Sequence, residues 1–354
     1  MEGSMFETGS VHFGMIGCGS ASIPVCEAIT ALPDTELTAV YDVNLELATD
    51  ISQRFGSRMT GTLDELLADP NVDVIYTAVP HYLLYPLTTR VLEAGKHALT
   101  EKPLAMSLDE IDRLITLAAS RTLTLGVFYE MRYAPAHALA RELIRSGAIG
   151  RIIGIQIQSL IDKPLHYWQS GYGARSVNPW RGLKAQAGGG VILMNTSHLL
   201  DALFHITDLS VSHVSGQLDH LTSNVEVEDM AAATLRFNNG AIGSIMAGAH
   251  IRGARNEECC FIYGTEGQIR LPDPYGSDAL QVYLKRTWED LAADQWHSIP
   301  VDPAPVYQQA IADFARAIRS GGCAPIDAYS ARQVLAVVLA IYQSATENRT
   351  ISIS

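Results

Sequence analysis

Residues 11–22, VHFGMIGCGSAS, decide how the first part of this chain folds. The apolar run Val11–Ile16 predicts a buried strand, and the glycine-rich turn after it leads into a helical stretch. The first glycine of such a turn, Gly17, permits the tight turn, and the second, Gly19, lets the backbone approach a diphosphate at the helix N-terminus. The third position holds Ser22 in place of glycine or alanine. Other residues of this predicted dinucleotide-binding turn are expected to contact the cofactor: Cys18, Ser20 and Ala21.

A carboxylate follows the second predicted strand, Leu37–Tyr41. This residue, Asp42, lies 23 residues beyond Gly19 (42 − 19). A carboxylate at this place accepts hydrogen bonds from the ribose hydroxyls of an adenosine and repels a 2′-phosphate. No arginine follows within several residues, so the sequence predicts NAD as the cofactor and not NADP. The alternative is an aspartate of an ordinary turn before Asn44.

Strands alternate with helices as far as about residue 130. The predicted strands are Val11–Ile16, Leu37–Tyr41, Val72–Val79, His97–Thr100 and Leu123–Phe128. The helices expected between them are Ala48–Phe55, Leu63–Ala68, Pro86–Glu93 and one opened by a capping box at Ser107–Glu110. Because this alternation is typical of a parallel sheet covered on both faces, we expect a doubly wound Rossmann domain over residues 1–130.

The pattern changes after a further predicted helix, Ala134–Ser146. Long β-branched or alternating runs are separated by hairpin signals: Arg151–Ile161, Met230–Phe237, Ala241–Ala247, Cys259–Tyr263 and Gln268–Leu271. Three helices are predicted among and after them: Val191–Phe204, Val306–Arg319 and Ala328–Thr346. We therefore expect an α+β domain over residues 131–327 with a large, open, mostly antiparallel sheet. The C-terminal helix, in residues 328–354, is expected to pack back on the Rossmann domain.

Composition limits the partners. A chain of 354 residues with a formal charge of −13 is long enough for two domains and unsuited to nucleic acid or an anionic membrane surface. Its five cysteines form no C-x-x-C pair and no array with metal-ligand spacing, so we expect reduced thiols and no metal site. No export signal or apolar run of membrane-spanning length is visible, and we expect a cytoplasmic protein.

Residues 94–105, AGKHALTEKPLA, resemble the AGKHV-EKP-LA signature of the Gfo/Idh/MocA family of sugar and cyclitol dehydrogenases. Further stretches resemble family motifs in the same order: RYAP at 132–135, LIRSGAIG at 143–150, WR at 180–181, GGG at 188–190, HLLD at 198–201 and YGTEG at 263–267. The resemblance covers nearly the whole chain. It implies NAD-dependent oxidation of a secondary hydroxyl of a sugar, cyclitol or glycoside, or reduction of the ketone. It also implies a homodimer or homotetramer formed through the open sheet.

Lys102 is the first catalytic candidate. It follows a predicted strand at the carboxyl edge of the sheet, where ligands bind in open α/β folds. A buried lysine beside the positively charged nicotinamide would give up its proton readily and assist proton transfer from the alcohol. The alternative is an ordinary surface lysine.

His198 is the second candidate, because the resemblance makes it the histidine that faces the substrate. Inositol dehydrogenase-like members carry an aspartate four residues earlier, where this chain has Met194, which cannot carry a proton. Asn195 is able to orient a hydroxyl or an imidazole but not to act as a base. The predicted catalytic set is therefore Lys102 and His198, with Asn195 as a helper. The alternative for His198 is a core histidine bonded to the backbone.

The nicotinamide side departs from the family pattern at Pro80-His81, where Pro-Asn is usual. We expect His81 to line the nicotinamide, the alternative being a loop histidine without a role. Other predicted cofactor contacts on this side are Ala78, Val79, Pro80, Glu101, Lys102, Arg132, Trp180 and Arg181.

Aromatic and basic residues are concentrated between residues 162 and 187. Flat aromatic faces suit a polyhydroxylated ring, and cations suit a carboxylate or phosphate on it. The predicted substrate contacts are Lys102, Tyr167, Trp168, Tyr172, Arg175, Lys184, Asn195 and His198. The alternative is a loop that packs on a partner subunit.

Two other functions compete with a dehydrogenase. One is a redox-neutral glycosidase or epimerase that retains NAD, which the methionine at position 194 favours. The other is a sugar-responsive regulator without catalysis, against which the presence of both Lys102 and His198 argues.

Overall fold

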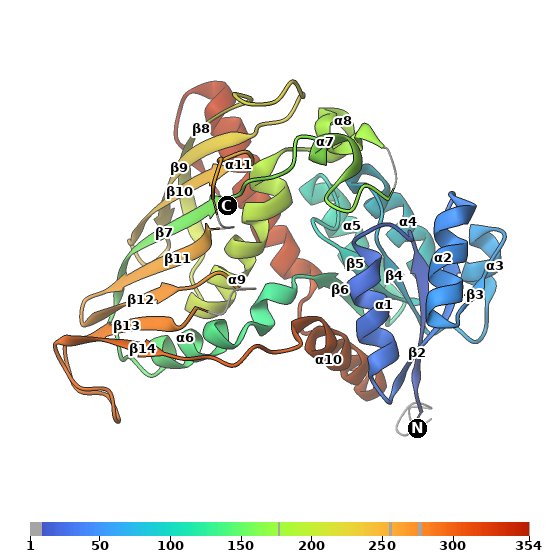
Figure 1. The fold of residues 1–354 in the computed structure, drawn as a ribbon, viewed down its shortest axis with the longest axis horizontal. Helices are drawn as coiled ribbons and strands as arrows, with labels where there is room; N and C mark the ends of the chain where they lie inside the picture. Colours follow the sequence, from blue (N-terminus) through green and yellow to red (C-terminus); the bar gives the residue numbers. More distant parts are fainter. Residues whose placement is uncertain (1–8, 176–177, 255–256, 275–277, 354) are drawn as a thin grey trace. The chain divides into compact units, whose positions relative to one another are not determined.

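A computed structural model describes residues 9–175, 178–254, 257–274 and 278–353 (Figure 1). The chain forms two compact units, each assembled from separate segments of the sequence. The first unit contains the described residues up to Tyr129, together with His166–Gly188 and Pro305–Arg332. The second contains Glu130–Leu165, Gly189–Ala304 and Gln333–Ser354, as far as these are described. None of the described helices is long and apolar enough to cross a membrane.

The first unit is built on a six-stranded parallel sheet. Its strands are β1 (Val11–Ile16), β2 (Thr35–Tyr41), β3 (Arg58–Met59), β4 (Val74–Thr77), β5 (His97–Glu101) and β6 (Leu125–Phe128). They lie in the order β3-β2-β1-β4-β5-β6, and every neighbouring pair is parallel. The order reverses between β1 and β4, which is where open α/β sheets bind their ligands. The predicted doubly wound Rossmann sheet is confirmed.

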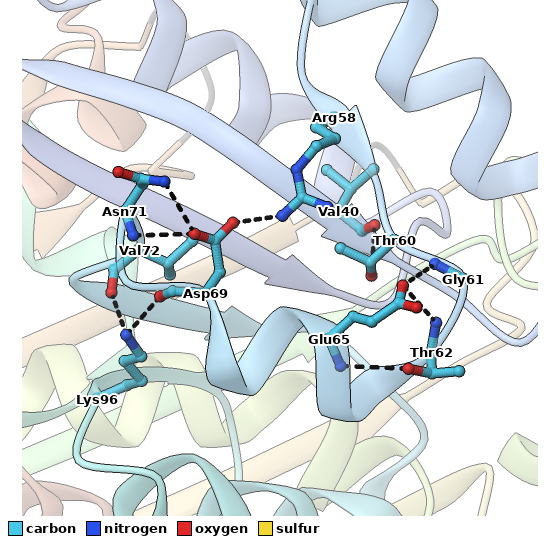
Figure 2. Close-up of polar contacts among 10 residues, drawn as sticks. All are labelled: Val40, Arg58, Thr60, Gly61, Thr62, Glu65, Asp69, Asn71, Val72 and Lys96. Atoms are coloured by element: carbon cyan, nitrogen blue, oxygen red, sulfur yellow. Dashed lines mark hydrogen bonds and ion pairs between the residues drawn. The ribbon is translucent and has the colours of Figure 1, made fainter.

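Several helices of this unit begin at residues whose side chains cap their first free N–H groups. The helices of the unit are α1 (Ser22–Ala31), α2 (Leu45–Phe55), α3 (Leu63–Ala68), α4 (His81–Glu93), α5 (Leu108–Ser120), α10 (Val306–Ser320) and three short ones, α7 (Tyr167–Ser170), η2 (Pro179–Gly182) and α8 (Lys184–Ala187). Asn44 accepts the first free N–H groups of α2, and Thr62 forms a full capping box with Glu65 at α3 (Figure 2). Ser107 caps α5 by accepting from the backbone of Glu110, but the Glu110 carboxylate accepts from Met106, so the predicted box is only half formed.

Helix α4 starts five residues earlier than predicted. Pro86 was expected to open the helix at its first turn, but it lies inside a helix that begins at His81. Proline there removes one hydrogen bond of the second turn. The additional turn is stabilised by burial, because His81 and Leu84 are both removed from solvent.

A cluster of hydrogen bonds and ion pairs joins β3, the end of α3 and the residue before β5 near the amino-terminal ends of the strands (Figure 2). The carboxylate of Asp69, at the end of α3, accepts from Arg58 of β3 and from the backbone of Asn71. Lys96 donates to the carbonyl oxygens of Asp69 and Val72, at 2.7 Å each. The hydrogen bond from Asn71 is the main cause that lowers the pKa of Asp69.

The second unit is built on a nine-stranded sheet. Its strands are β7 (Ile152–Leu160), β8 (Val211–Asp219), β9 (Met230–Phe237), β10 (Ile242–Gly248), β11 (Glu257–Gly264), β12 (Gly267–Leu271), β13 (Leu280–Leu284), β14 (Gln295–Ile299) and β15 (Ile351–Ser352). They lie in the order β14-β13-β12-β11-β7-β10-β9-β8-β15. All neighbours are antiparallel except β7 and β10. The predicted large, mostly antiparallel sheet is confirmed.

Helices cover one face of this second sheet. They are η1 (Glu130–Tyr133), α6 (Pro135–Arg145), the π-helical segment η3 (Ile192–Thr196), α9 (Ser197–Thr207) and the greater part of α11 (Ala328–Glu347). The opposite face carries no helix among the described residues (Figure 1). Alternate residues of β9 and β10 are exposed on it, including Ile242 and Met246, which are 56% and 43% exposed.

The first break between the units, at Tyr129/Glu130, coincides with the domain boundary predicted at 130, but His166–Gly188 and Pro305–Arg332 also belong to the first unit, which the linear boundaries at 130 and 327 did not include. Helix α10 belongs to the first unit because it packs against α1 and β1. Helix α11 is divided: Arg332 donates to Asp112 of α5, whereas Tyr342 donates to Glu228 in the second unit.

Candidate functional site

The turn between β1 and α1 has the geometry of a dinucleotide site. Gly17 has a φ of 92°, and a Cβ there would lie 2.1 Å from the carbonyl oxygen of Ala78, so only glycine fits. A Cβ at Gly19 would meet no atom within 4 Å, so the backbone is open to a ligand. Ser22, at the third position, is buried and donates to the Gly19 carbonyl at 2.7 Å, which accommodates its hydroxyl.

Asp42 holds this turn directly. Its Oδ2 accepts from the backbone N–H of Cys18, and its Oδ1 from that of Asn44, both at 2.7 Å. A carboxylate oxygen accepts more than one hydrogen bond, so both oxygens retain capacity for ribose hydroxyls. The exposed apolar side chains of Val43 and Leu45, at 88% and 58%, follow immediately, and sequence reasoning missed them. They present the kind of apolar surface on which an adenine ring packs.

These observations fit NAD. The open backbone at Gly19 leaves space for the phosphates of a dinucleotide. The N-terminus of α1 has no side-chain cap, so its dipole and free N–H groups can face the negative charge of these phosphates. The carboxylate of Asp42 lies where the ribose hydroxyls of the adenosine are bound. Ala78, Val79 and Pro80 connect β4 to α4 beside this turn, and Ala78 donates to the Ile16 carbonyl at 2.8 Å. Two other predicted cofactor residues lie in the turn itself: Ser20 is half-buried and Ala21 is exposed.

Glu101 and Lys102 lie at the carboxyl end of β5, and both are half-buried. Tyr76 donates to the Glu101 carboxylate at 2.5 Å, and burial raises the pKa of that carboxyl, against the lowering effect of Lys102. The charge of Lys102 also contributes to lowering the pKa of His81, which follows the carboxyl end of the neighbouring strand β4.

His81 is buried as the first residue of α4. Its Nδ1 donates to the carbonyl of Ala187 at 2.7 Å, and its ring packs on Trp180 with centroids 4.7 Å apart. Burial lowers the pKa of His81 to about 3, and the charge of Lys102 adds to this effect. The ring is therefore neutral, with its proton on Nδ1 and its Nε2 available as an acceptor.

The aromatic residues predicted for the substrate mostly pack on one another. Tyr167 contacts the rings of Trp168 and Tyr172, at centroid distances of 5.2 and 4.9 Å. The Arg181 guanidinium lies over Tyr167 and Trp180, at 5.6 and 4.6 Å from their centroids. The side chains of this aromatic and basic group differ in solvent exposure. Tyr167, Trp168 and Trp180 are buried, whereas Tyr172 and Lys184 are exposed.

In the second unit, η3 and α9 carry the other candidates. Met194 is buried, and Asn195 is half-buried, with an Oδ1 that has no hydrogen-bond partner among the described residues. Glu228 caps this helical segment, accepting from the backbone N–H groups of Gly190 and Ile192 at 2.7 and 3.0 Å. Burial raises the pKa of this carboxyl. Sequence reasoning missed Glu228, which no motif marks.

Two glycines before η3 are needed because larger side chains there would collide with neighbouring residues. A Cβ at Gly189 would lie 1.9 Å from the Tyr342 hydroxyl, and one at Gly190 would lie 1.8 Å from the Glu228 carbonyl oxygen. Tyr342 itself donates to the Glu228 carboxylate at 2.9 Å. The small residues therefore let α11 and the segment just before β9 approach the start of η3 and hold it in place.

His198 has an acidic neighbour that its own helix does not provide. Its Nδ1 lies 3.6 Å from Glu130 Oε2, and their side chains are 13% and 5% exposed. Two residues along η1, Arg132 donates through Nε and Nη2 to both oxygens of Asp201, at 2.6 Å each. This bidentate pair joins η1 to α9 and so aligns Glu130 with His198. The predicted contact of Arg132 with the cofactor remains a prediction.

Each unit thus groups part of the predicted set. The first unit brings the fingerprint turn, Glu101, Lys102, His81 and the segment with Trp180 and Arg181 to the carboxyl edge of its sheet. The second unit brings together Asn195, His198 and Glu130. Sequence reasoning missed Glu130, because the only signal in the sequence was its position two residues before the RYAP motif.

Comparisons with known proteins agree with this geometry. The oxidoreductase family with an NAD-binding Rossmann fold matches residues 11–129, and the GFO/IDH/MocA C-terminal domain matches residues 137–270. A 1,5-anhydro-D-fructose reductase of Ensifer adhaerens is 30% identical over 74% of this chain and 74% of its own length. A levoglucosan dehydrogenase of Pseudarthrobacter phenanthrenivorans is 30% identical over 68% of this chain and 65% of its own.

A solved structure of levoglucosan dehydrogenase in complex with NADH and L-sorbose is also similar. It superposes with a TM-score of 0.86 at 26% identity, covering 98% of this chain and 99% of the other. Both family domains are therefore present, in sequence order, in a chain with this fold. The chain belongs to the GFO/IDH/MocA family and is an NAD-dependent oxidoreductase.

Proposed function

We propose that this protein oxidises a secondary hydroxyl of a sugar, cyclitol or glycoside, or reduces the corresponding ketone. The observation that carries the proposal is Lys102 at the carboxyl end of β5, in the same unit as a turn fitted to NAD. Two relatives are named for levoglucosan and 1,5-anhydro-D-fructose, which makes these compounds the first substrates to test.

Bound NAD would supply the hydride acceptor, and residues of the chain would bind the cofactor, orient the substrate and take up the hydroxyl proton. The backbone from Gly17 to Ser22 holds the diphosphate, and Asp42 holds the adenosine ribose. Lys102 Nζ assists removal of the hydroxyl proton. Neutral His81, fixed by Ala187, presents Nε2 as an acceptor on the nicotinamide side without adding a positive charge there.

His198 contacts the substrate in this proposal, and Glu130 supports it. A carboxylate near Nδ1 favours the tautomer that protonates Nδ1, so that Nε2 faces the substrate as an acceptor. It also offsets the charge of an imidazolium that takes up a proton. Glu130 thus takes the role of the aspartate that Met194 replaces. Asn195 Oδ1, which needs a donor, accepts from a substrate hydroxyl.

Turnover is tested with the purified full-length chain. NADH formation or consumption is followed by its near-ultraviolet absorbance, with levoglucosan, 1,5-anhydro-D-fructose, inositols and aminocyclitols. We expect at least one compound to turn over, and Lys102→Met to lower kcat roughly 10²- to 10⁴-fold with NADH still bound. Lys285→Met, which removes an exposed lysine paired with Asp294, is the matched control and keeps full activity. Absence of both NADH binding and turnover would refute the proposal.

A redox-neutral glycosidase or epimerase is the second candidate, favoured by the segment that lies across the nucleotide turn, described below. In that case the cofactor copurifies with the protein, and a glycoside is cleaved or a sugar epimerised without net NADH. Product analysis by mass spectrometry or NMR separates this outcome from a dehydrogenase.

We further propose that a second copy of the chain covers the open face of the nine-stranded sheet. Ile242, Met246 and Trp296 expose apolar surface on β10 and β14, and the family resemblance implies a dimer or tetramer. Light scattering after gel filtration is expected to show an oligomer that Met246→Lys dissociates. A monomeric wild-type protein would contradict this. The cytoplasmic location stays a prediction from the sequence.

A further inference from the structure

We infer that residues 171–175 form a strap across the dinucleotide turn, with Arg175 as a ligand of the cofactor diphosphate. The inference rests on the binding of NAD at this turn. It gives Arg175, which the sequence placed among the substrate contacts, a different role.

The strap lies directly on the turn. A Cβ at Gly173 would lie 2.4 Å from the hydroxyl oxygen of Ser20, so the backbone of Gly173 packs directly on the Ser20 side chain and leaves no room for a larger residue. Two residues on, Arg175 Nη2 donates to the carbonyl of Cys18 at 3.4 Å and to Asp50 of α2 at 2.7 Å. All of these residues belong to the first unit.

Farther along the chain, residues 178–187 contact the start of α4. Trp180 packs on His81, and Ala187 accepts from His81 Nδ1, at the start of α4. Helix α4 follows β4, whereas the turn at Ser20 follows β1. Because β1 and β4 flank the point where the strand order reverses, residues 171–175 and residues 178–187 contact the two loops between which a dinucleotide lies in such sheets.

The hydrogen bonding of Arg175 is incomplete. Its Nε is buried and has no hydrogen-bond partner among the described residues, while Nη2 is engaged by Cys18 and Asp50. A buried N–H without an acceptor is costly, and a guanidinium pairs preferentially with phosphate or carboxylate oxygens. The open side of Gly19 lies next to the Cys18 carbonyl in the same turn. A diphosphate bound there would supply the acceptor.

Two consequences follow for the cofactor. The diphosphate gains a charge-assisted hydrogen bond, and its exit requires the strap to detach from Ser20 and Asp50. The strap therefore slows dissociation, and the Arg175–Asp50 pair controls how fast it opens.

The test measures NADH binding without any substrate. NADH fluorescence gives the Kd for the full-length chain, and displacement by excess NAD⁺ in a stopped-flow instrument gives the dissociation rate constant. Arg175→Gln is expected to raise the Kd roughly 10-fold or more, as loss of a charged hydrogen bond does. Asp50→Asn keeps the cation and frees the strap, so the dissociation rate rises about 2- to 5-fold, in line with a partly exposed ion pair.

Arg54→Gln is the matched control. It removes an arginine of the same helix α2 whose ion pair with Glu27 is also exposed, and it should leave both constants at wild-type values. Circular dichroism verifies that each variant folds, and Asp50→Asn tests the strap even where Arg175→Gln does not fold. Wild-type binding of NADH with unchanged constants in both variants would overturn the strap. Failure of the wild type to bind NADH would instead refute the nucleotide site itself.

Discussion

Two glycines of the fingerprint turn give opposite predictions, because one is needed by the fold and the other by the ligand. Gly17 has a positive φ, and its missing side chain makes room for the Ala78 carbonyl. Gly19 faces open space, and its φ is not in the left-handed region. Substituting each by alanine separates stability from binding.

The cost of Gly17→Ala is worked from two terms. A left-handed backbone costs an L-residue about 1–2 kcal/mol. The new Cβ would lie 2.1 Å from the Ala78 carbonyl oxygen, so β1 and the end of β4 must move apart, and such overpacking costs about 1–3 kcal/mol. We therefore expect a loss of roughly 2–5 kcal/mol in the free energy of unfolding.

Gly19→Ala should leave the protein as stable as the wild type, within about 1 kcal/mol, since the added methyl meets no atom and alanine restricts the unfolded chain. It should nevertheless weaken NADH binding strongly, because the methyl occupies the space through which the diphosphate approaches the backbone.

The assay combines urea unfolding, followed by circular dichroism, with NADH titration on both variants. The reasoning is refuted by a Gly17→Ala protein of wild-type stability. It is equally refuted by a Gly19→Ala protein that binds NADH as the wild type does.

Three other perturbations test the sites described above. Glu130→Gln removes the charge beside His198 and is expected to lower kcat about 10-fold or more while the Kd for NADH stays constant, whereas Asp208→Asn, at the far end of α9, changes neither. The pKa of Asp69 is lower in the folded state, so its contribution to stability is present above its ordinary pKa of 3.8 and is lost as the pH falls through the folded value. Asp69→Asn should therefore reduce the urea midpoint at neutral pH and flatten its acid decline; parallel curves for both proteins would contradict this. His81→Leu leaves the Ala187 carbonyl without its donor and should cost about 1–3 kcal/mol of unfolding free energy, and an unchanged urea midpoint would argue against that bond.

The sequence by itself determined the nucleotide half of this protein. The strand, the glycine turn and the following helix are contiguous in residues 11–31, and Asp42 comes at the end of the next strand. Such features can be predicted from short stretches of sequence, because the positive φ at Gly17 and the helix N-terminus depend mainly on neighbouring residues. The alternation of strands and helices sufficed for the parallel sheet for the same reason.

Helix and strand limits were less predictable where packing overrides local preference. Pro86 indicated the start of a helix, but burial of Leu84 and His81 extends α4 by more than a turn before it. Short edge strands such as β3 and β15 carry too few residues to show a period, and only their pairing with β2 and β8 defines them.

Only the tertiary structure decided which side chains meet. Glu130 lies 68 residues before His198 (198 − 130), and Arg175 lies 157 residues after Cys18, so no spacing in the chain indicates either contact. Met194 at the expected aspartate position suggested that the histidine lacked a carboxylate, yet η1 supplies one because Arg132 and Asp201 fasten it to α9. A sequence motif identifies functional residues that lie close together in the chain. Contacts between distant segments depend on the packing of whole helices and sheets, which a single sequence does not display.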